Sequence, residues 1–530
     1  MKFNSRLLTA AMCLFTFLLL VTINISAQRV ALSVLGTYAT GIYNQGAAEI
    51  VAYDPQTRRL FVVNGATSKI DVLSIASPSN PTLLFSIDVS PYGRQANSVA
   101  VKNGIVAAAV EAVVKTDPGK VVFYNADGSF LNSLPVGVLP DMVTFTPNGL
   151  KVLVANEAEP NSDYTIDPEG SVSIVDISGG VANATVTTAG FAQFNGTQLA
   201  PSIRIFGPNA TVAKDLEPEY ISVAPDGLTA WVTLQENNAV GVLNLTNNSF
   251  TSLIGLGFKN HNLTGFGLDA SDRDNANNIA NWQVFGMYQP DAVAVTEHNG
   301  ETFFITANEG DAREYTGFIE EVRVSSLMLD PTIFPNAATL KMDANLGRLT
   351  VTNRLGDTDN DGDFDALYVF GGRSFSIWRP DGEQIFDSGD SFEQITSSFL
   401  PPRFNAGHTT NARDDRSDNK GPEPEGVAVG EAFGRKYAFF VLERFGGVAV
   451  YDITNPFEPR FAHYINNRNF EAATNTAAAG DLGPEGLQFI PAGQSPNGRP
   501  MLVVANEVSG TTTVYQFRQL TGRLLFSDQF

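Results

Sequence analysis

Short runs of alternating apolar and polar residues recur along the chain after its first 27 residues. Seven segments share one pattern, in which a polar or acidic residue, often preceded by proline, leads into a run rich in β-branched residues. Alternation with period two is typical of β-strands, and Pro, Asn and Gly clusters indicate tight turns between them. The seven segments are AEIVAY (48–53), ANSVAV (96–101), PDMVTF (140–145), PEYISV (218–223), PDAVAV (290–295), PEGVAV (424–429) and PEGLQF (484–489).

Each leading segment is followed by a turn and a second apolar run, and most by a third. The leading polar residues are separated by 48, 44, 78, 72, 134 and 60 residues, and the shortest of these spacings match one β-propeller blade. The longer spacings indicate inserted loops. The longest contains a further strand pair, DALYVFGGRSFSIW (365–378), which has no leading residue.

The strand pattern predicts an all-β fold, a single closed β-propeller with inserted loops. Seven segments begin with a polar or acidic residue, whereas eight pairs of apolar runs can be counted. The number of blades is therefore seven or eight, with eight slightly favoured. The alternative is a string of small β-sandwiches. It is disfavoured because no linker rich in Pro, Ser or Gly separates independent units.

The first 27 residues have the pattern of a secretory signal peptide. Lys2 and Arg6 precede a mostly apolar stretch, 7–25, and a small residue, Ala27, stands before the expected cleavage point. The alternative is a retained membrane anchor. The single cysteine, Cys13, lies in this leader, so the domain at 28–530 has none. No other segment is apolar enough to span a bilayer, and we expect an exported protein: secreted, periplasmic or cell-surface.

Charge and missing motifs narrow the classes of function. The 530 residues include 56 acidic and 34 basic ones, a formal net charge of −22, which argues against nucleic acid and anionic membranes as partners. Four scattered histidines form no HExxH motif, and no GxSxG or P-loop sequence occurs. No catalytic residue is identified, and a hydrolase here would need a metal ion to activate water.

Propeller geometry gathers many of the acidic residues. The first strand of a blade begins, and the second ends, on the same face beside the central channel. Carboxylates crowded there repel one another unless a cation or a basic side chain compensates them, and hard oxygen ligands suit calcium, or alternatively magnesium. The other interpretation is that each acid accepts backbone N–H bonds and joins neighbouring blades. The candidate metal ligands at this mouth are Glu157, Glu219, Asp291, Glu309, Glu425, Glu485 and Glu507.

A second acidic cluster, DTDNDGDFD (357–365), resembles the first nine positions of a D-x-D-x-D-G calcium loop. The twelfth position is Tyr368 in place of glutamate, and a strand is expected over 366–370, so the cluster is predicted to be a loop-type calcium site without flanking helices. The alternative is a solvated acidic hairpin. The candidate ligands are Asp357, Asp359, Asp361, Asp363 and Asp365.

The segment 408–426, HTTNARDDRSDNKGPEPEG, mixes both charges and leads directly into one of the seven strands. It either folds over the channel mouth, bringing Arg413, Arg416 and Lys420 to the acids, or forms an ordinary surface loop.

Several longer motifs resemble the bacterial choice-of-anchor I family, which is itself similar to an animal mesenchyme-specific cell surface glycoprotein. They are YQPDAVAV (288–295), TANEGDAREY (306–315), DALYVFGGRSFSIW (365–378), DDRSDNKGPEPEGVAVG (414–430), ERFGGVAVYDITNP (443–456) and GPEGLQF (483–489). The resemblance covers roughly residues 30–518 and implies an exported β-propeller. It brings no catalytic residues, although some relatives are labelled alkaline-phosphatase-like.

Two functions are compatible with these features. The first is a calcium-binding, exported β-propeller that acts as an extracellular or cell-surface interaction module, whose partner is an unknown surface ligand, glycan or protein. The alternative is a metal-dependent phosphoesterase that uses the acids of the channel mouth.

Overall fold

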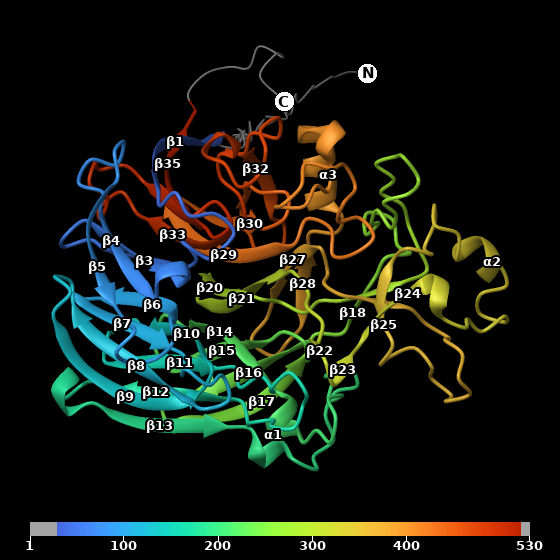
Figure 1. The fold of residues 1–530 in the computed structure, drawn as a ribbon, viewed down its shortest axis with the longest axis horizontal. Helices are drawn as coiled ribbons and strands as arrows, with labels where there is room; N and C mark the ends of the chain where they lie inside the picture. Colours follow the sequence, from blue (N-terminus) through green and yellow to red (C-terminus); the bar gives the residue numbers. More distant parts are fainter. Residues whose placement is uncertain (1–28, 521–530) are drawn as a thin grey trace, which may run out of the picture.

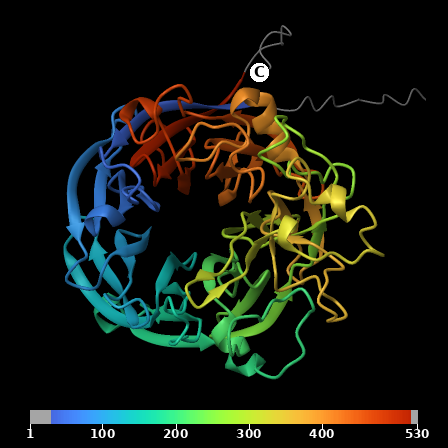
Figure 2. The same ribbon diagram turned by 45° about the vertical axis from the view of Figure 1, so that its right-hand side comes forward.

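The computed structural model describes residues 29–520. The fold is all-β: strands make up most of the regular structure, and the α-helices are short, α1 Val212–Asp215, α2 Ala337–Leu340 and α3 Ser391–Phe399. Seven four-stranded antiparallel sheets follow one another around a common centre (Figures 1 and 2).

In six of the seven sheets the strands lie in chain order, and in five of these six they are also consecutive. The first three are β2 Val51–Asp54, β3 Arg59–Asn64, β4 Lys69–Ser74, β5 Thr82–Asp88; β6 Ala96–Lys102, β7 Ile105–Val110, β8 Pro118–Asn125, β9 Phe130–Val138; and β10 Pro140–Phe145, β11 Lys151–Asn156, β12 Ser171–Asp176, β13 Thr185–Gly190. The next three are β14 Pro218–Val223, β15 Thr229–Leu234, β16 Ala239–Asn244, β17 Ser249–Gly255; β20 Val293–His298, β21 Glu301–Asn308, β27 Ser374–Trp378, β28 Gln384–Asp387; and β29 Pro424–Ala432, β30 Arg435–Leu442, β31 Val448–Asp452, β32 Arg460–Ile465.

The seventh sheet joins the two ends of the described chain. It contains β33 Pro484–Ile490, β34 Met501–Asn506, β35 Thr511–Gln519 and, as its outer strand, β1 Val30–Ala39. β1 runs antiparallel to β35, from Val30 opposite Gln519 to Ala39 opposite Thr511. The first strand of each sheet contacts the first strands of both neighbouring sheets, and β33 contacts β2.

The hydrophobic core lies in layers between adjacent sheets. Phe61 and Val72 of one sheet, for example, share a buried cluster with Val106 and Val122 of the next. The second strand of each sheet is therefore covered on both faces and reads as a continuous apolar run, whereas an outer strand such as β5 is largely exposed.

Each of the seven predicted leading segments overlaps the first strand of a sheet, but the additional strand pair at 365–378 does not form an eighth sheet within residues 29–520. β26 (Tyr368–Val369) pairs with β19 outside the seven sheets, while β27 pairs with β21, placing Trp378 opposite Phe304. The structure therefore does not confirm the slightly favoured prediction of eight blades. A long insertion, residues 309–373, separates the second strand of one sheet from the third, so the strands that end this insertion have the sequence pattern of a further blade.

The insertions at 258–287 and 309–373 pack together at one side of the ring of sheets (Figure 1). Their buried cluster includes Leu268, Val284, Val324 and Leu349. Their strands are β18 Phe258–Asn260, β19 Phe285–Met287, β22 Glu314–Tyr315, β23 Phe318–Ile319, β24 Glu321–Arg323, β25 Thr350–Thr352 and β26. The 3-10 turns of the described chain are η1 Gly65–Thr67, η2 Val181–Asn183, η3 Ala192–Phe194, η4 Val324–Ser326, η5 Pro401–Arg403 and η6 Ala477–Ala479.

The expected leader, residues 1–27, lies outside the described residues. Among residues 29–520, no helix is long and apolar enough to cross a membrane.

The packing of β1 can be tested at Leu32. Its side chain is 3% exposed and belongs to a cluster with Tyr437 and Phe517. We expect Leu32→Ala to lower the free energy of unfolding by about 2–5 kcal/mol, because it leaves a cavity between β1 and its neighbours. Urea denaturation measures this loss. The control is Leu83→Ala, whose side chain is 42% exposed and which should change stability by less than about 0.5 kcal/mol. Equal effects of the two substitutions would contradict this packing.

Candidate functional site: an acidic mouth at the centre of the ring

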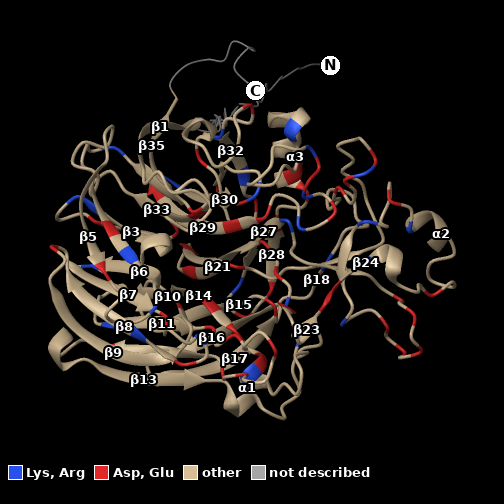
Figure 3. Cartoon of the chain, in the orientation of Figure 1, with Lys and Arg blue, Asp and Glu red and all other residues tan. Residues whose placement is uncertain are grey.

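Acidic residues stand where most of the first strands begin. Because these strands contact one another around the centre, the acids gather at one end of the ring, where Figure 3 shows acidic positions on the inner strands. We call this end the acidic mouth. The acids that lead the first strands are Glu49, Asp141, Glu219, Asp291, Glu425 and Glu485, and Asn97 stands at the equivalent place in β6.

A repeated irregularity in the backbone accompanies these acids. In four sheets the register between the first two strands shifts directly after a leading proline, for example between Pro218 and Ile221. The acid, such as Glu219, lies inside this bulge. A bulge locally redirects side chains, and proline is tolerated there because no ladder hydrogen bond from its nitrogen is required. In these four sheets the Pro-acid pair of the sequence therefore marks a bulge that places a carboxylate at the mouth.

A second set of acids follows the second strands. Each second strand runs antiparallel to the first, so that Asn156 lies opposite Pro140 and the next residue, Glu157, reaches the same end. The amide of Glu157 donates to the carbonyl of Leu139 over 2.9 Å and fixes this turn. The acids of this set are Glu111, Glu157, Glu236, Glu309, Glu443 and Glu507.

The asparagines that precede several of these glutamates have a structural role. Asn156 Nδ2 donates to Ser173 Oγ over 3.0 Å, and Asn308 Nδ2 donates to Ser376 Oγ over 2.9 Å, which joins second and third strands. Their amide oxygens also accept hydrogen bonds, from Gly137 N and from Thr306 Oγ1. These asparagines are thus engaged within their sheets, and the carboxylates remain the ligand atoms of the mouth.

The structure brings the predicted mouth residues together in groups of three. Carboxylate or imidazole atoms within 4.8 Å of one another occur in Glu157, Glu219 and Glu236; in Glu309, Glu425 and Glu443; and in His408, Glu443 and Glu507. Asp291 and Glu485 belong to no such group within residues 29–520, although they lie at the same mouth.

Burial and crowding disfavour ionisation of the mouth acids. Burial raises the pKa of Glu219 well above its ordinary value, and the carboxylates of Glu236 and Asp291 raise it further. The pKa of Glu425 is raised in the same way, by burial and then by Glu443. A cation bound beside these groups would favour their charged forms.

Segment 408–426 folds over the mouth, as one of the two sequence interpretations predicts. Arg416 Nη2 donates to Glu423 Oε1 over 2.7 Å, and Lys420 Nζ donates to Glu309 Oε1 over 3.0 Å. Arg413 instead pairs with its neighbour Asp414. Arg416 and Lys420 therefore reach the acids, whereas Arg413 does not.

Glu423 is the point where the basic side chains converge. It is fully buried and accepts from Arg416 and Arg444, while Lys420 Nζ lies 3.1 Å from its Oε2. Burial opposes its ionisation, but Lys420, Arg416 and Arg444 together hold the pKa of Glu423 well below its ordinary value. This carboxylate is ionised and fully compensated by the protein itself.

The predicted calcium loop divides into two groups of acids. Oxygens of Asp357, Asp359 and Asp361 lie within 4.8 Å of one another, whereas Asp363 and Asp365 group with Asp330. Backbone amides also donate into the loop, from Asp361 to Asp357 Oδ1 over 3.2 Å and from Gly362 to Asp357 Oδ2 over 3.1 Å. Asp359 and Asp361 are exposed and the other aspartates of the loop are half-buried. Of the strand expected over 366–370, only Tyr368 and Val369 are paired. The grouped carboxylate oxygens agree with a cation-binding loop, and the backbone hydrogen bonds to Asp357 agree with an acidic turn.

Sequence reasoning does not find Glu111 or Asp330. Glu111 directly follows the second strand IVAAAV, so its place after a strand is a usable signal, although the Asn-Glu pair of other sheets is missing. Asp330 lies 27 residues before Asp357, and only the packing of the insertions brings it to the loop.

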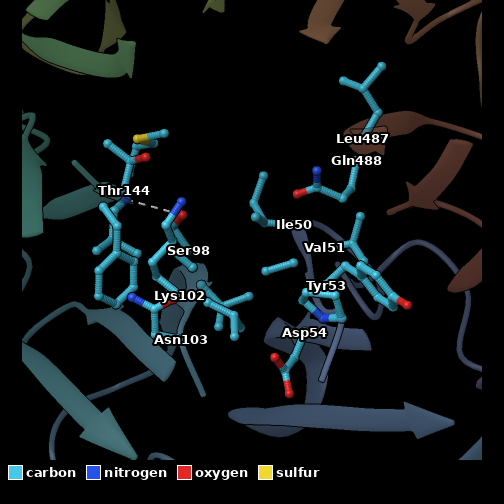
Figure 4. A pocket seen from close by; sticks show the side chains of 18 of the residues that line it. Ile50, Val51, Tyr53, Asp54, Ser98, Lys102, Asn103, Thr144, Leu487 and Gln488 are labelled. Carbon is cyan, nitrogen blue, oxygen red and sulfur yellow. Dashed lines mark hydrogen bonds between the residues drawn. The ribbon is translucent and has the colours of Figure 1, made fainter. Parts of the chain in front are cut away.

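A cavity of about 430 Å³ is lined by residues from the first strands of five sheets, and Figure 4 shows part of this lining. Its lining includes Ile50, Ser98, Thr144, Leu487 and Gln488, which are uncharged. The mouth is thus strongly acidic, while this part of the central space is lined mainly by neutral side chains.

These observations define an all-β protein of repeated four-stranded sheets with carboxylates gathered at one end of its centre. The model of the choice-of-anchor I domain matches residues 49–456, and the chain belongs to the choice-of-anchor I family.

Two curated proteins are similar to parts of the chain. Gigasin-3a of Magallana gigas is 32% identical over 198 residues, which are 35% of this chain and 69% of that protein. The mesenchyme-specific cell surface glycoprotein of Strongylocentrotus purpuratus is 27% identical over 285 residues, which are 47% of this chain and 36% of the glycoprotein.

Two solved structures align with most of the chain at low identity. Hydrazine synthase of Kuenenia stuttgartiensis gives a TM-score of 0.44 with 11% identity, covering 90% of this chain and 99% of that one. The β-propeller domain of Cps50 (Swd1) of Myceliophteria thermophila gives 0.43 with 8% identity, covering 92% and 100%.

The crowding of carboxyls predicts that stability depends on pH. Burial, followed by the charges of Glu507 and Asp141, raises the pKa of Glu49 to about 8, against about 4.3 in an unfolded chain. The folded state then holds a proton that the unfolded state releases, so this contribution to stability is complete below about pH 4 and is lost as the pH rises through 8.

In EDTA, we therefore expect urea denaturation to show higher stability at pH 5.5 than at pH 8.5. Glu49→Gln should reduce the difference by about 1–2 kcal/mol, because the amide carries no charge at either pH. Glu431→Gln, at an exposed site in β29, serves as control and should leave the difference unchanged. An unchanged difference in Glu49→Gln would show that Glu49 does not retain its proton.

Proposed function

We propose that this protein is an exported, calcium-binding β-propeller of seven blades that acts as an extracellular or cell-surface interaction module. The observation that carries the proposal is the acidic mouth, where carboxylates from six of the seven first strands surround one end of a ring of sheets. Such a mouth suits cations and positively charged groups and repels nucleic acid.

Support for the seven-bladed architecture comes from three features. There are seven four-stranded sheets, their first strands contact one another in a complete circle, and β1 and β35 lie in one sheet. A circle of sheets leaves no exposed inner edge.

Support for export comes from the leader pattern at 1–27 and from the family. One similar protein is by its name a cell surface glycoprotein. The partner is proposed to be a surface ligand, either a glycan or a protein.

Support for calcium comes from the chemistry of the ligands. The loop 357–365 and the mouth both offer carboxylate oxygens, the ligands that calcium prefers, with magnesium as the alternative. The carboxylates of the loop reach one another without flanking helices, so calcium would brace the loop at the edge of the insertions.

A metal-dependent phosphoesterase is the second candidate, because His408 and Arg444 stand beside Glu443 at the mouth. Besides the metal ion, basic side chains such as these two could bind the phosphate oxygens. Arg444 Nε already lies 3.0 Å from Glu423 Oε2 and 2.9 Å from Glu443 Oε2, and His408 Nδ1 lies 2.9 Å from Glu443 Oε1. Both basic side chains are therefore already paired with acids of the protein and are not free to bind a phosphate.

The first experiment expresses the full chain with its leader and treats intact cells with a membrane-impermeant biotin reagent. We expect the protein to be labelled, or to be recovered from the medium or the periplasm. We also expect the purified protein, in calcium or magnesium, to hydrolyse p-nitrophenyl phosphate no faster than a reaction without protein. Retention in the cytoplasm would contradict the proposal. Metal-dependent turnover that is lost in Glu219→Gln or Glu425→Gln would favour the phosphoesterase.

The second experiment tests calcium at the loop. We expect calcium to raise the melting temperature relative to EDTA, because a ligand that binds only the folded state at 100 times its Kd stabilises it by about 2.7 kcal/mol. The double variant Asp359→Asn/Asp361→Asn should lose much of this shift in calorimetry. Asp117→Asn, at another exposed site, should keep it. A shift that is the same in both variants would exclude the loop as the calcium site.

A further inference from the structure

The acidic mouth is electrostatically asymmetric, because one side of it is neutralised by the protein's own cations. Lys420 Nζ lies 3.0 Å from Glu309 Oε1 and donates to the carbonyl of Gly310 over 2.6 Å. Arg444 Nε lies 2.9 Å from Glu443 Oε2. We call the group of Glu309, Glu425 and Glu443 the paired side. Although Glu425 Oε2 accepts no hydrogen bond there, both of its neighbours face a basic side chain.

The group of Glu157, Glu219 and Glu236 has no such partner, and we call it the three-glutamate site. Within residues 29–520 no lysine, arginine or histidine forms an ion pair with any of the three. The two nearby cations are already engaged with other acids. Lys115 pairs with Glu159, and Arg313 pairs with Asp215 over 2.6 Å and with Glu217 over 3.0 Å.

Two buried oxygens of this site have no hydrogen-bond partner among residues 29–520. Glu219 is 7% exposed and Glu236 is 5% exposed, yet Glu219 Oε2 and Glu236 Oε2 accept no hydrogen bond. A buried, unpaired carboxylate is costly, and here two of them lie against a third, Glu157. Two of the three side chains thus carry a buried oxygen to which no residue within 29–520 donates.

The spacing of these atoms fits a hard divalent cation. One oxygen from each side chain lies within 4.8 Å of the others, and two opposed calcium–oxygen bonds of 2.3–2.6 Å span roughly 4.6–5.2 Å. Glu157 is only partly buried, so the site is reachable from the mouth, and water can complete the coordination.

We propose that Glu157, Glu219 and Glu236 bind one divalent cation of the calcium type, and that the ammonium group of Lys420 takes the corresponding place on the paired side, which therefore binds none. This deepens the proposed function, since it assigns the cation of the mouth to three named residues. The proposal depends only on the geometry of the mouth. The number of bound ions can therefore be measured whether or not the protein is exported, binds a partner or hydrolyses a phosphoester.

The test counts calcium in a background that lacks both acid groups of the loop, Asp357→Asn/Asp359→Asn/Asp361→Asn/Asp363→Asn/Asp365→Asn. Equilibrium dialysis against Ca²⁺ at pH 8, followed by elemental analysis, should give one ion per chain. Adding Glu219→Gln or Glu236→Gln should weaken binding by at least about 100-fold, because one of three charged ligands is lost. The matched variants Glu309→Gln and Glu425→Gln, on the paired side, should keep the ion within about threefold.

A second readout separates a lost ligand from a damaged fold. In EDTA at pH 8, Glu219→Gln should melt at the same temperature as the background protein or higher, because a neutral amide removes repulsion among buried carboxylates. If Glu219→Gln does not fold, the partly exposed Glu157→Gln takes its place in the dialysis. The proposal is overturned if the background protein binds no calcium, if calcium persists undiminished in both site variants, or if it is lost in Glu425→Gln.

Discussion

Packing of each sheet against two neighbours is the constraint on which the rest of this structure depends. The apolar layers lie between sheets, so a sheet at the end of an open row would expose one whole face to water. The sheet that contains both β1 and β35 has no such face, because its first strand, β33, contacts β2 as well as β29. The pairing of β1 with β35 links the two ends of the described chain within this sheet by hydrogen bonds, where no loop of the chain connects them.

This circular arrangement also creates the electrostatic problem at the mouth. A side chain at the start of a first strand is solvated in an open sheet but meets its counterparts from other sheets in a circle. Only one part of the mouth is compensated, because Lys420 and Arg416 of segment 408–426 form ion pairs with its acids. Around Glu219, no basic side chain within residues 29–520 pairs with the carboxylates. Carboxylate density by itself therefore says little about ion binding until the basic side chains are placed.

Much of the fold follows from local pattern, because strands with period two and Pro-acid bulges are features of short segments. All seven first strands were predictable for this reason. The pairing of β27 with β21 was not, since 65 residues separate Asn308 from Ser374 and a strand's partner is decided by packing over that distance.

The candidate site was predictable to a similar depth. The acids could be assigned to one face from blade geometry alone, as Glu157 and Glu219 show. Their division into paired and unpaired groups could not, because it depends on where Lys420 and Arg313 reach across the fold. Asp330 lay beyond prediction for the same reason: packing of the insertions brings it to Asp363 and Asp365.

The pairing of β1 with β35 has a consequence for how the protein is made. Residues 30–39 are synthesised long before their partner strand, residues 511–519, because 471 residues lie between the two. β1 must therefore wait, with Leu32 and Val30 uncovered, until β35 has been synthesised. Pairing of the two strands is therefore a late and long-range event, and until it occurs the chain exposes apolar surface that favours aggregation.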